Sequence, residues 1–153
     1  MSPHRRKATS THRPEAEERT AYPHFRRILT RWMDNDVYGH VNNVVYYSYF
    51  DTVVNAYLVK EGGLDIESSP VIGLCVESQC RYLSPVKFPD VLDAGLRVAK
   101  IGRSSVRYEI GIFHAGQSSA AAQGHFVHVY VDRVTRRPVD LPERMRAALT
   151  RLA

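Results

Sequence analysis

A stretch of 19 residues without glycine or proline, residues 42–60, limits the possible folds of this chain more than any other segment. Its length favours a helix over a strand, although it is rich in valine and tyrosine, which prefer strands. Asn42 or Asn43 can cap its amino end, and Gly62 and Gly63 can end it. Because apolar residues lie on nearly every face, we expect the helix to be buried inside the molecule.

Five other segments carry strand patterns and can bury this helix. The first, residues 24–33, has apolar anchors but alternates irregularly. In the other four, apolar residues recur at every second position, a period that is typical of strands. These four segments are residues 72–82, 92–98, 106–112 and 127–131. The connections after the second strand are short, so we expect neighbouring strands to be antiparallel.

The order of one strand, one long helix and four strands predicts a single α+β domain over residues 22–153. In this domain an antiparallel sheet of about five strands wraps round the central helix. A short final helix is expected from Pro142 or Glu143 to Leu152. Residues 1–21 have few apolar side chains and are expected to form a flexible basic tail. Because one sheet covers only one side of the helix, we expect the chain to form oligomers.

The net charge of +5 does not indicate nucleic-acid binding, because it belongs to the two ends of the chain. Residues 1–21 carry +2, residues 133–153 carry +4, and the middle carries −1. A nucleic-acid-binding domain is expected to carry its positive charge on a folded face. No apolar run reaches the roughly 18 residues of a membrane span, and the amino end lacks a signal-peptide core. We therefore expect no nucleic-acid or membrane partner and a cytoplasmic location.

The densest group of functional side chains is residues 34–43, DNDVYGHVNN, directly before the apolar helix. The segment combines two carboxylates, an imidazole and amides. A helix amino end carries free N–H donors and a partial positive charge. A carboxylate beside such donors can act as base or nucleophile on a carbonyl whose oxygen the donors polarise. This is the minimal machinery of acyl transfer.

The run D-x-D-x-x-G-H-V-N-N, followed by Tyr46 and Tyr49, resembles the hot-dog-fold acyl-CoA thioesterases of the 4-hydroxybenzoyl-CoA thioesterase type. The resemblance covers roughly residues 24–150, and the G-H-V-N-N form looks more like the general acyl-CoA branch. It implies hydrolysis of an acyl-CoA thioester to a free acid and coenzyme A. It implies no metal and no cofactor, since coenzyme A is part of the substrate. It also implies homodimers that pair into homotetramers, with active sites at the dimer interface.

The resemblance makes Asp36 the catalytic carboxylate, acting either as the nucleophile on the thioester carbonyl or as the base that activates a water. His40 and Asn42 are the other candidate catalytic residues. His40 could orient the carboxylate or donate to the thioester oxygen, and Asn42 could fix the loop as well as cap the helix. Asp34 is expected to hydrogen-bond within the turn.

Candidate substrate-binding residues come from two segments. Tyr46 and Tyr49 lie three residues apart on the expected helix, and they either pack in the core or line the acyl pocket. The resemblance also places a turn with basic and hydroxyl side chains, between the third and fourth strands, over the nucleotide phosphates of coenzyme A. The matching residues here are Lys100, Arg103, Ser104 and Ser105. An arginine suits this contact because its donors can meet two phosphate oxygens at once.

Two other functions remain open: a non-catalytic module that binds acyl thioesters, and a hot-dog enoyl-CoA hydratase or dehydratase. Such hydratases use a D-x-N-P-x-H run with Asp and His five residues apart. Here His40 follows Asp36 by four residues and Asp34 by six, without an intervening proline. A zinc site at His125 and His128 is not expected, because their spacing on a strand points the two rings to opposite faces.

Overall fold

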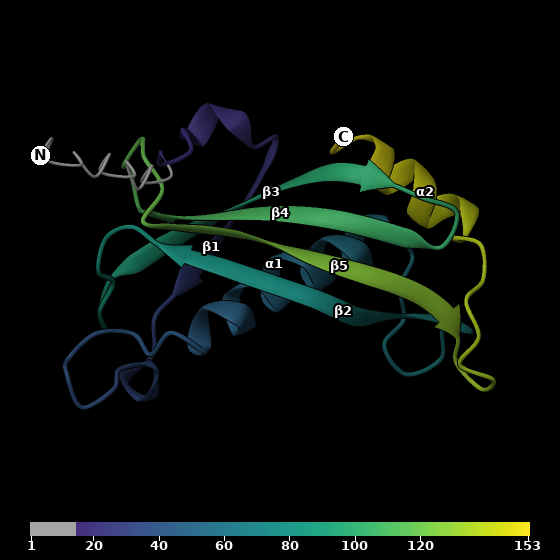
Figure 1. Ribbon diagram of the computed structural model, residues 1–153, viewed down its shortest axis with the longest axis horizontal. Coiled ribbons are helices and arrows are strands. Elements are labelled where there is room, and N and C mark those ends of the chain that lie inside the picture. The colour runs from purple at the N-terminus through teal and green to yellow at the C-terminus, as the bar shows by residue number, and fades with distance from the viewer. Residues whose placement is uncertain (1–14) are drawn as a thin grey trace, which may run out of the picture.

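The computed structural model describes residues 15–153, and it consists of one five-stranded antiparallel sheet curved round one long helix (Figure 1). In chain order the elements are η1 (Arg19–Ala21), β1 (His24–Leu29), η2 (Trp32–Asp34), α1 (Val45–Glu61), β2 (Val71–Tyr82), β3 (Val91–Ile101), β4 (Ser105–His114), β5 (Ala122–Asp132) and α2 (Glu143–Thr150). This is the α+β hot-dog fold that the sequence predicts. No helix in residues 15–153 is long and apolar enough to cross a membrane.

Helix α1 packs against the inner face of the sheet and supplies the centre of the core. Its buried residues are Tyr46, Tyr49, Phe50, Val53, Val54, Tyr57 and Leu58. A polar stripe that includes Ser48, Asp51 and Thr52 is exposed, so the expectation of a helix buried on nearly every face is wrong for this side. The helix begins at Val45, later than expected, because the side chain of Asn42 accepts the backbone N–H of Val44 at 3.1 Å in a turn before the helix.

The strand order is β1-β3-β4-β5-β2, and all pairs are antiparallel. Short turns join β3 to β4 and β4 to β5, and these strands are neighbours as expected. In contrast, β2 and β3 follow one another in the chain but do not pair, because β2 pairs with β5. The segment of residues 83–90 therefore carries the chain from one side of the sheet to the other.

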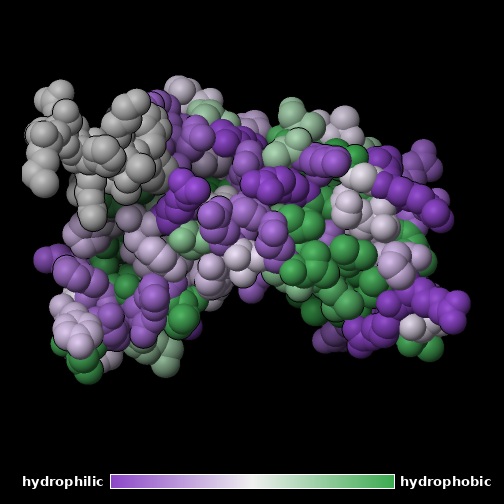
Figure 2. Space-filling model, viewed as in Figure 1, coloured by the Kyte–Doolittle hydropathy of each residue, from purple (hydrophilic) through white to green (hydrophobic). Residues whose placement is uncertain are grey.

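Strand β2 forms one edge of the sheet and is its most exposed strand. None of its residues is fully buried, and the side chains of Leu74 and Val76 are 38% and 62% exposed. Figure 2 shows an apolar surface on the side of the molecule towards α2, beside a more polar surface. Among residues 15–153, no strand pairs with the outer edge of β2. Long exposed edges of this kind are usually covered or paired in native proteins.

The segment before β1 differs from the expected tail. The backbone N–H of Glu17 donates to a side chain of β5 at 2.7 Å. Arg19 forms an ion pair with Asp93 at 3.0 Å, and its guanidinium lies over the ring of Phe25. These contacts hold residues 15–21 on the sheet although the segment has few apolar side chains. The rest of the expected tail, residues 1–14, lies outside the described residues.

Candidate active site

Asp34 anchors the loop that leads into α1. Its buried carboxylate accepts hydrogen bonds from the backbone and guanidinium of Arg31 at 2.9 and 3.0 Å, and from the hydroxyl of Tyr49 at 2.8 Å. Burial alone would raise the pKa of Asp34, but these hydrogen bonds outweigh it and lower the pKa. Asp34 is therefore an ionised group that joins η2 to α1, as expected for a residue that hydrogen-bonds within the turn.

Asp36 lies in a tight turn two residues later. Its backbone N–H donates to the carbonyl of His40 at 2.9 Å, and the turn includes Gly39 at a φ of +82°, a conformation that glycine adopts at little cost. One carboxylate oxygen, Oδ1, accepts the backbone N–H of Tyr38 at 2.8 Å. The other oxygen accepts no hydrogen bond from residues 15–153. It is available to a substrate or a water.

A cavity of about 460 Å³ opens beside Asp36. The loop before α1, the first turn of α1 and the segment after β2 all contribute to its wall. The lining residues are Asp36, His40, Val41, Asn43, Tyr46, Tyr82, Leu83, Ser84, Pro85 and Val86. A volume of this size is typical of sites for small organic ligands.

Helix α1 and strand β2 each contribute one tyrosine to the wall of this cavity, Tyr46 and Tyr82. The rings of Tyr46 and Tyr82 meet edge to face at 5.0 Å between centroids, and the hydroxyl of Tyr82 donates to the carbonyl of Asn43 at 2.9 Å. Burial raises the pKa of Tyr46 to about 12. Its hydroxyl is therefore protonated at neutral pH and can donate a hydrogen bond. The cavity thus combines a carboxylate, an imidazole and a phenol with apolar side chains.

The structure brings together only some of the predicted site residues. Asp36, His40 and Tyr46 line the cavity. Asn42 does not, because its side chain accepts the N–H of Val44, and the neighbouring Asn43 lines the cavity in its place. Tyr49 does not either, so its expected place in the acyl pocket is not found. Its hydroxyl is held by Asp34, and its ring borders a different cavity, between β1 and α1.

Tyr82 and residues 83–86 are cavity residues that the sequence analysis missed. Tyr82 shares its strand parity with Cys80, which packs against the core. This parity places Tyr82 on the helix-facing side of the sheet and was the available signal. Nothing local marks residues 83–86, because their place in the cavity depends on the path of the chain between β2 and β3.

The turn between β3 and β4 lies at the far end of the sheet from Asp36 within one chain (Figure 1). His114, at the end of β4, contacts the carbonyl of Pro85 in the cavity wall at 3.2 Å. The turn lies at the other end of this strand, about 30 Å away. There Arg103 pairs with Asp140. One chain therefore does not bring the predicted phosphate contacts Lys100, Arg103, Ser104 and Ser105 to Asp36.

The two strand histidines point to opposite faces of the sheet, as expected. His125 Nε2 lies 2.8 Å from a carboxylate oxygen of Glu77, whereas His128 is packed among aromatic rings on the inner face. Within residues 15–153, no three His, Cys, Asp or Glu side chains are grouped so that they could hold a metal ion.

Comparison with known proteins gives consistent matches. The structure is similar to that of the PA5185 protein from Pseudomonas aeruginosa strain PAO1, with 55% identity and a TM-score of 0.89 over 91% of this chain and 96% of that chain. It is also similar to a thioesterase from Thermus thermophilus complexed with coenzyme A and zinc, with 31% identity and a TM-score of 0.71 over 84% of this chain and 98% of that chain.

A curated relative, the uncharacterized protein YsmA of Bacillus subtilis (strain 168), is 28% identical over 93 residues. These residues are 61% of this chain and 63% of YsmA, so the chain spans less than two thirds of that relative. The family model of the thioesterase-like superfamily matches residues 30–149, which include the loop with Asp36, α1 and all strands except β1. This match covers most of the chain and shows that it belongs to the thioesterase-like superfamily.

Proposed function

We propose that this protein hydrolyses acyl-CoA thioesters to a free carboxylic acid and coenzyme A. The observation that carries the proposal is the carboxylate of Asp36, which has one oxygen available on the wall of a 460 Å³ cavity. Membership of the thioesterase-like superfamily supports thioester hydrolysis. The coenzyme A in the structure of the Thermus thermophilus thioesterase supports coenzyme A as the thiol carrier.

Asp36 would act in one of two ways. As nucleophile, its oxygen bonds to the thioester carbon, the coenzyme A thiolate leaves, and water then hydrolyses the acyl-enzyme anhydride. As general base, it takes a proton from a water that attacks the same carbon, and the departing thiolate is protonated. His40 lines the same cavity, and in this proposal it orients the carboxylate or donates to the thioester oxygen.

The amino end of α1 offers donors for the negative charge that develops on the thioester oxygen. Asn43 and Tyr46 line the cavity, and their backbone N–H groups make no hydrogen bond to residues 15–153. Fixed N–H donors beside a reacting carbonyl typically contribute about 100- to 1,000-fold in rate. The dipole of α1 adds a partial positive charge at the same end.

The exposed edge of β2 supports a homodimer as part of this proposal. If two copies pair their β2 strands antiparallel about a two-fold axis, opposite ends of the two sheets come together. The turn that carries Lys100, Arg103, Ser104 and Ser105 in one copy then lies towards the Asp36 end of the other. The phosphates of coenzyme A would be met there by Arg103 of the partner subunit. Pairing of dimers into homotetramers remains a prediction.

The experiment that tests the function is steady-state release of thiol from a panel of acyl-CoAs with aliphatic and aromatic acyl groups. We expect turnover of at least one member of the panel. A protein that binds acyl-CoAs tightly but releases no thiol would be a binding module. Addition of water to an enoyl-CoA without thiol release would identify a hydratase.

A further inference from the structure

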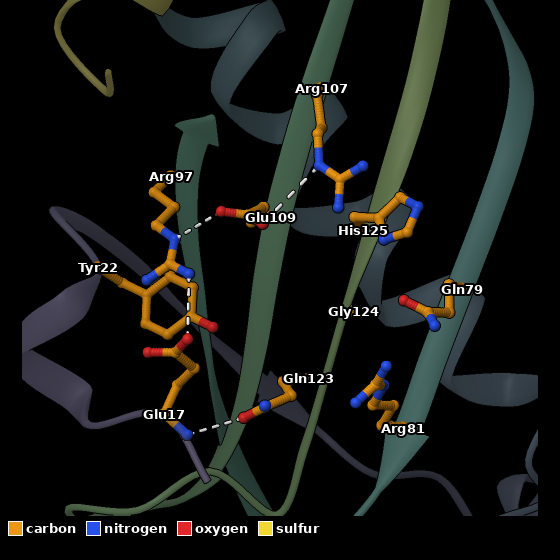
Figure 3. Close-up of a pocket in the computed structure, with 10 residues that line it drawn as sticks. All are labelled: Glu17, Tyr22, Gln79, Arg81, Arg97, Arg107, Glu109, Gln123, Gly124 and His125. Atoms are coloured by element: carbon orange, nitrogen blue, oxygen red, sulfur yellow. Dashed lines mark hydrogen bonds and ion pairs between the residues drawn. The ribbon is translucent and has the colours of Figure 1, made fainter. Parts of the chain in front are cut away.

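A second cavity, of about 120 Å³, lies on the outer face of the sheet, on the side away from α1 (Figure 3). The strand register places four of its side chains in one row across β3, β4, β5 and β2. These are Arg97, Glu109, His125 and Gln79. The segment before β1 adds Glu17 and Tyr22. No residue lines both this cavity and the cavity beside Asp36, so the two are separate sites.

Arg97 already pairs with both carboxylates that line this outer cavity. Its guanidinium lies 3.3 Å from Glu17 and 3.0 Å from Glu109. It also lies over the ring of Tyr22, 4.8 Å from the centroid. Arg97 therefore pairs with both acidic groups of the cavity and has little remaining capacity for a ligand.

Two other arginines reach into the outer cavity from opposite ends (Figure 3). Arg107 forms a long ion pair with Glu109, 3.8 Å from Nε to the carboxylate and beyond hydrogen-bond distance, whereas Arg81 forms no ion pair with residues 15–153. The side-chain amide of Gln79 and the imidazole of His125 lie between them. Glu109 offsets only part of the charge of Arg107, and Arg81 is not paired with any described acidic group, so an anion between the two guanidinium groups would lower the electrostatic energy of both.

We propose that the outer cavity binds a small oxyanion, a carboxylate or a phosphate, through Arg81 and Arg107. Paired guanidinium N–H groups match two oxygens of either anion, and hydrogen bonds to a charged acceptor are among the strongest in proteins. The amide N–H groups of Gln79 can complete the shell. The small volume excludes a nucleotide and a long acyl chain, so this site does not take the thioester proposed for the cavity beside Asp36.

Isothermal titration calorimetry of the full chain tests this proposal. Sodium phosphate and sodium acetate are titrated separately, with sodium chloride holding the ionic strength constant. We expect one saturable site per chain for at least one of the two anions. Binding of phosphate alone assigns a phosphate site, and saturable acetate binding assigns carboxylates to it as well. The double variant Arg81→Gln/Arg107→Gln should bind at least about tenfold more weakly, the usual effect of losing one charged hydrogen bond.

The double variant Arg137→Gln/Arg144→Gln is the matched control, because it removes the same charge from the loop after β5 and from α2. It should keep the wild-type affinity. Circular dichroism and thermal unfolding check the fold of both variants. The single variant Arg81→Gln on the exposed edge strand provides a second test and should weaken binding several-fold. Absence of saturable binding of both anions, or equal loss of affinity in the control, would overturn the proposal.

Discussion

Asp34 and Asp36 are only two residues apart, yet their surroundings give them different chemistry. Asp34 is buried and accepts hydrogen bonds from Arg31 and Tyr49, so its oxygens are occupied. Asp36 has one oxygen held by a backbone N–H and one available in the cavity. A group whose acceptors are occupied positions a loop, and a group with an available lone pair can attack or deprotonate. The pair therefore divides into an anchor and a candidate catalytic residue.

Tyr49→Phe tests the anchor. The change removes the hydroxyl that donates to Asp34, so we expect a loss of about 1 kcal/mol in the free energy of unfolding. Turnover with acyl-CoA should remain near that of the wild type, because Tyr49 does not line the cavity beside Asp36. Denaturant unfolding and steady-state kinetics measure the two effects. Large loss of turnover at unchanged stability would instead place Tyr49 in the acyl pocket.

His128 should make stability depend on pH. Its ring is enclosed by aromatic side chains, its Nε2 has no partner within residues 15–153, and burial lowers its pKa to about 4. The unfolded chain takes up a proton near pH 6.5 and the folded chain does not, so unfolding is favoured as pH falls from 6.5 towards 4. The expected contribution is about 2 kcal/mol at pH 5.

The matched variant for this effect is His128→Phe, which keeps an aromatic ring but has no titrating group. Unfolding by denaturant at pH 7 and pH 5 should show a smaller loss of stability in the variant than in the wild type. Parallel pH profiles of the two proteins would show that His128 is not the source.

At the scale of elements, the parts of the fold that depend on local pattern were predictable. Val106, Tyr108, Ile110 and Ile112 occupy alternate positions and form β4, and the length of residues 42–60 identifies α1. The strand order was not predictable, because the crossing of residues 83–90 depends on long-range pairing. The same crossing adds residues 83–86 to the cavity wall.

The candidate site follows the same division. Asp36, His40 and Tyr46 were identified from a continuous motif whose backbone folds locally. Asn42 and Tyr49 were assigned to the site but have other hydrogen-bond partners. The side chain of Asn42 accepts the backbone N–H of Val44, and the hydroxyl of Tyr49 donates to Asp34, 15 positions earlier in the chain. Such partners are visible only once the turn and helix are placed together.

The proposed role of the β3–β4 turn depends on a second copy of the chain. We expect Arg103→Ala to raise KM for acyl-CoA several-fold with little change in kcat, because it removes binding that is equal in the ground and transition states. The effect should shrink at high salt and be absent for acyl-pantetheine, which lacks the nucleotide phosphates. Arg137→Ala, on another exposed loop, is the control. Equal weakening for both substrates would show that the turn does not contact the nucleotide.

At the scale of the whole molecule, the unpaired edge of β2 is the surface through which we propose that two copies associate. Val76 is exposed at this edge, at an irregular position between Cys75 and Glu77. Pairing of two edges would satisfy backbone groups and bury apolar side chains together.

Light scattering coupled to size-exclusion chromatography measures this assembly. We expect a mass of at least twice the 17.4 kDa chain at micromolar concentration. Val76→Lys, which places a charge at the edge, should shift the protein towards monomer and lower turnover together. Val134→Lys, at an exposed position in the loop after β5, should change neither. A fully active 17.4 kDa monomer would contradict the dimer.

The most direct test of the account is the turnover of Asp36→Asn. The variant keeps an oxygen that can accept the N–H of Tyr38, so the turn should fold, but it lacks the ionised carboxylate. Asp51→Asn, on the exposed side of α1, is the matched control for loss of one negative charge. With the best acyl-CoA of the panel, we predict a loss of kcat of at least about 100-fold for Asp36→Asn and near-normal kcat for Asp51→Asn. Near-normal kcat in a folded Asp36→Asn protein would contradict the account.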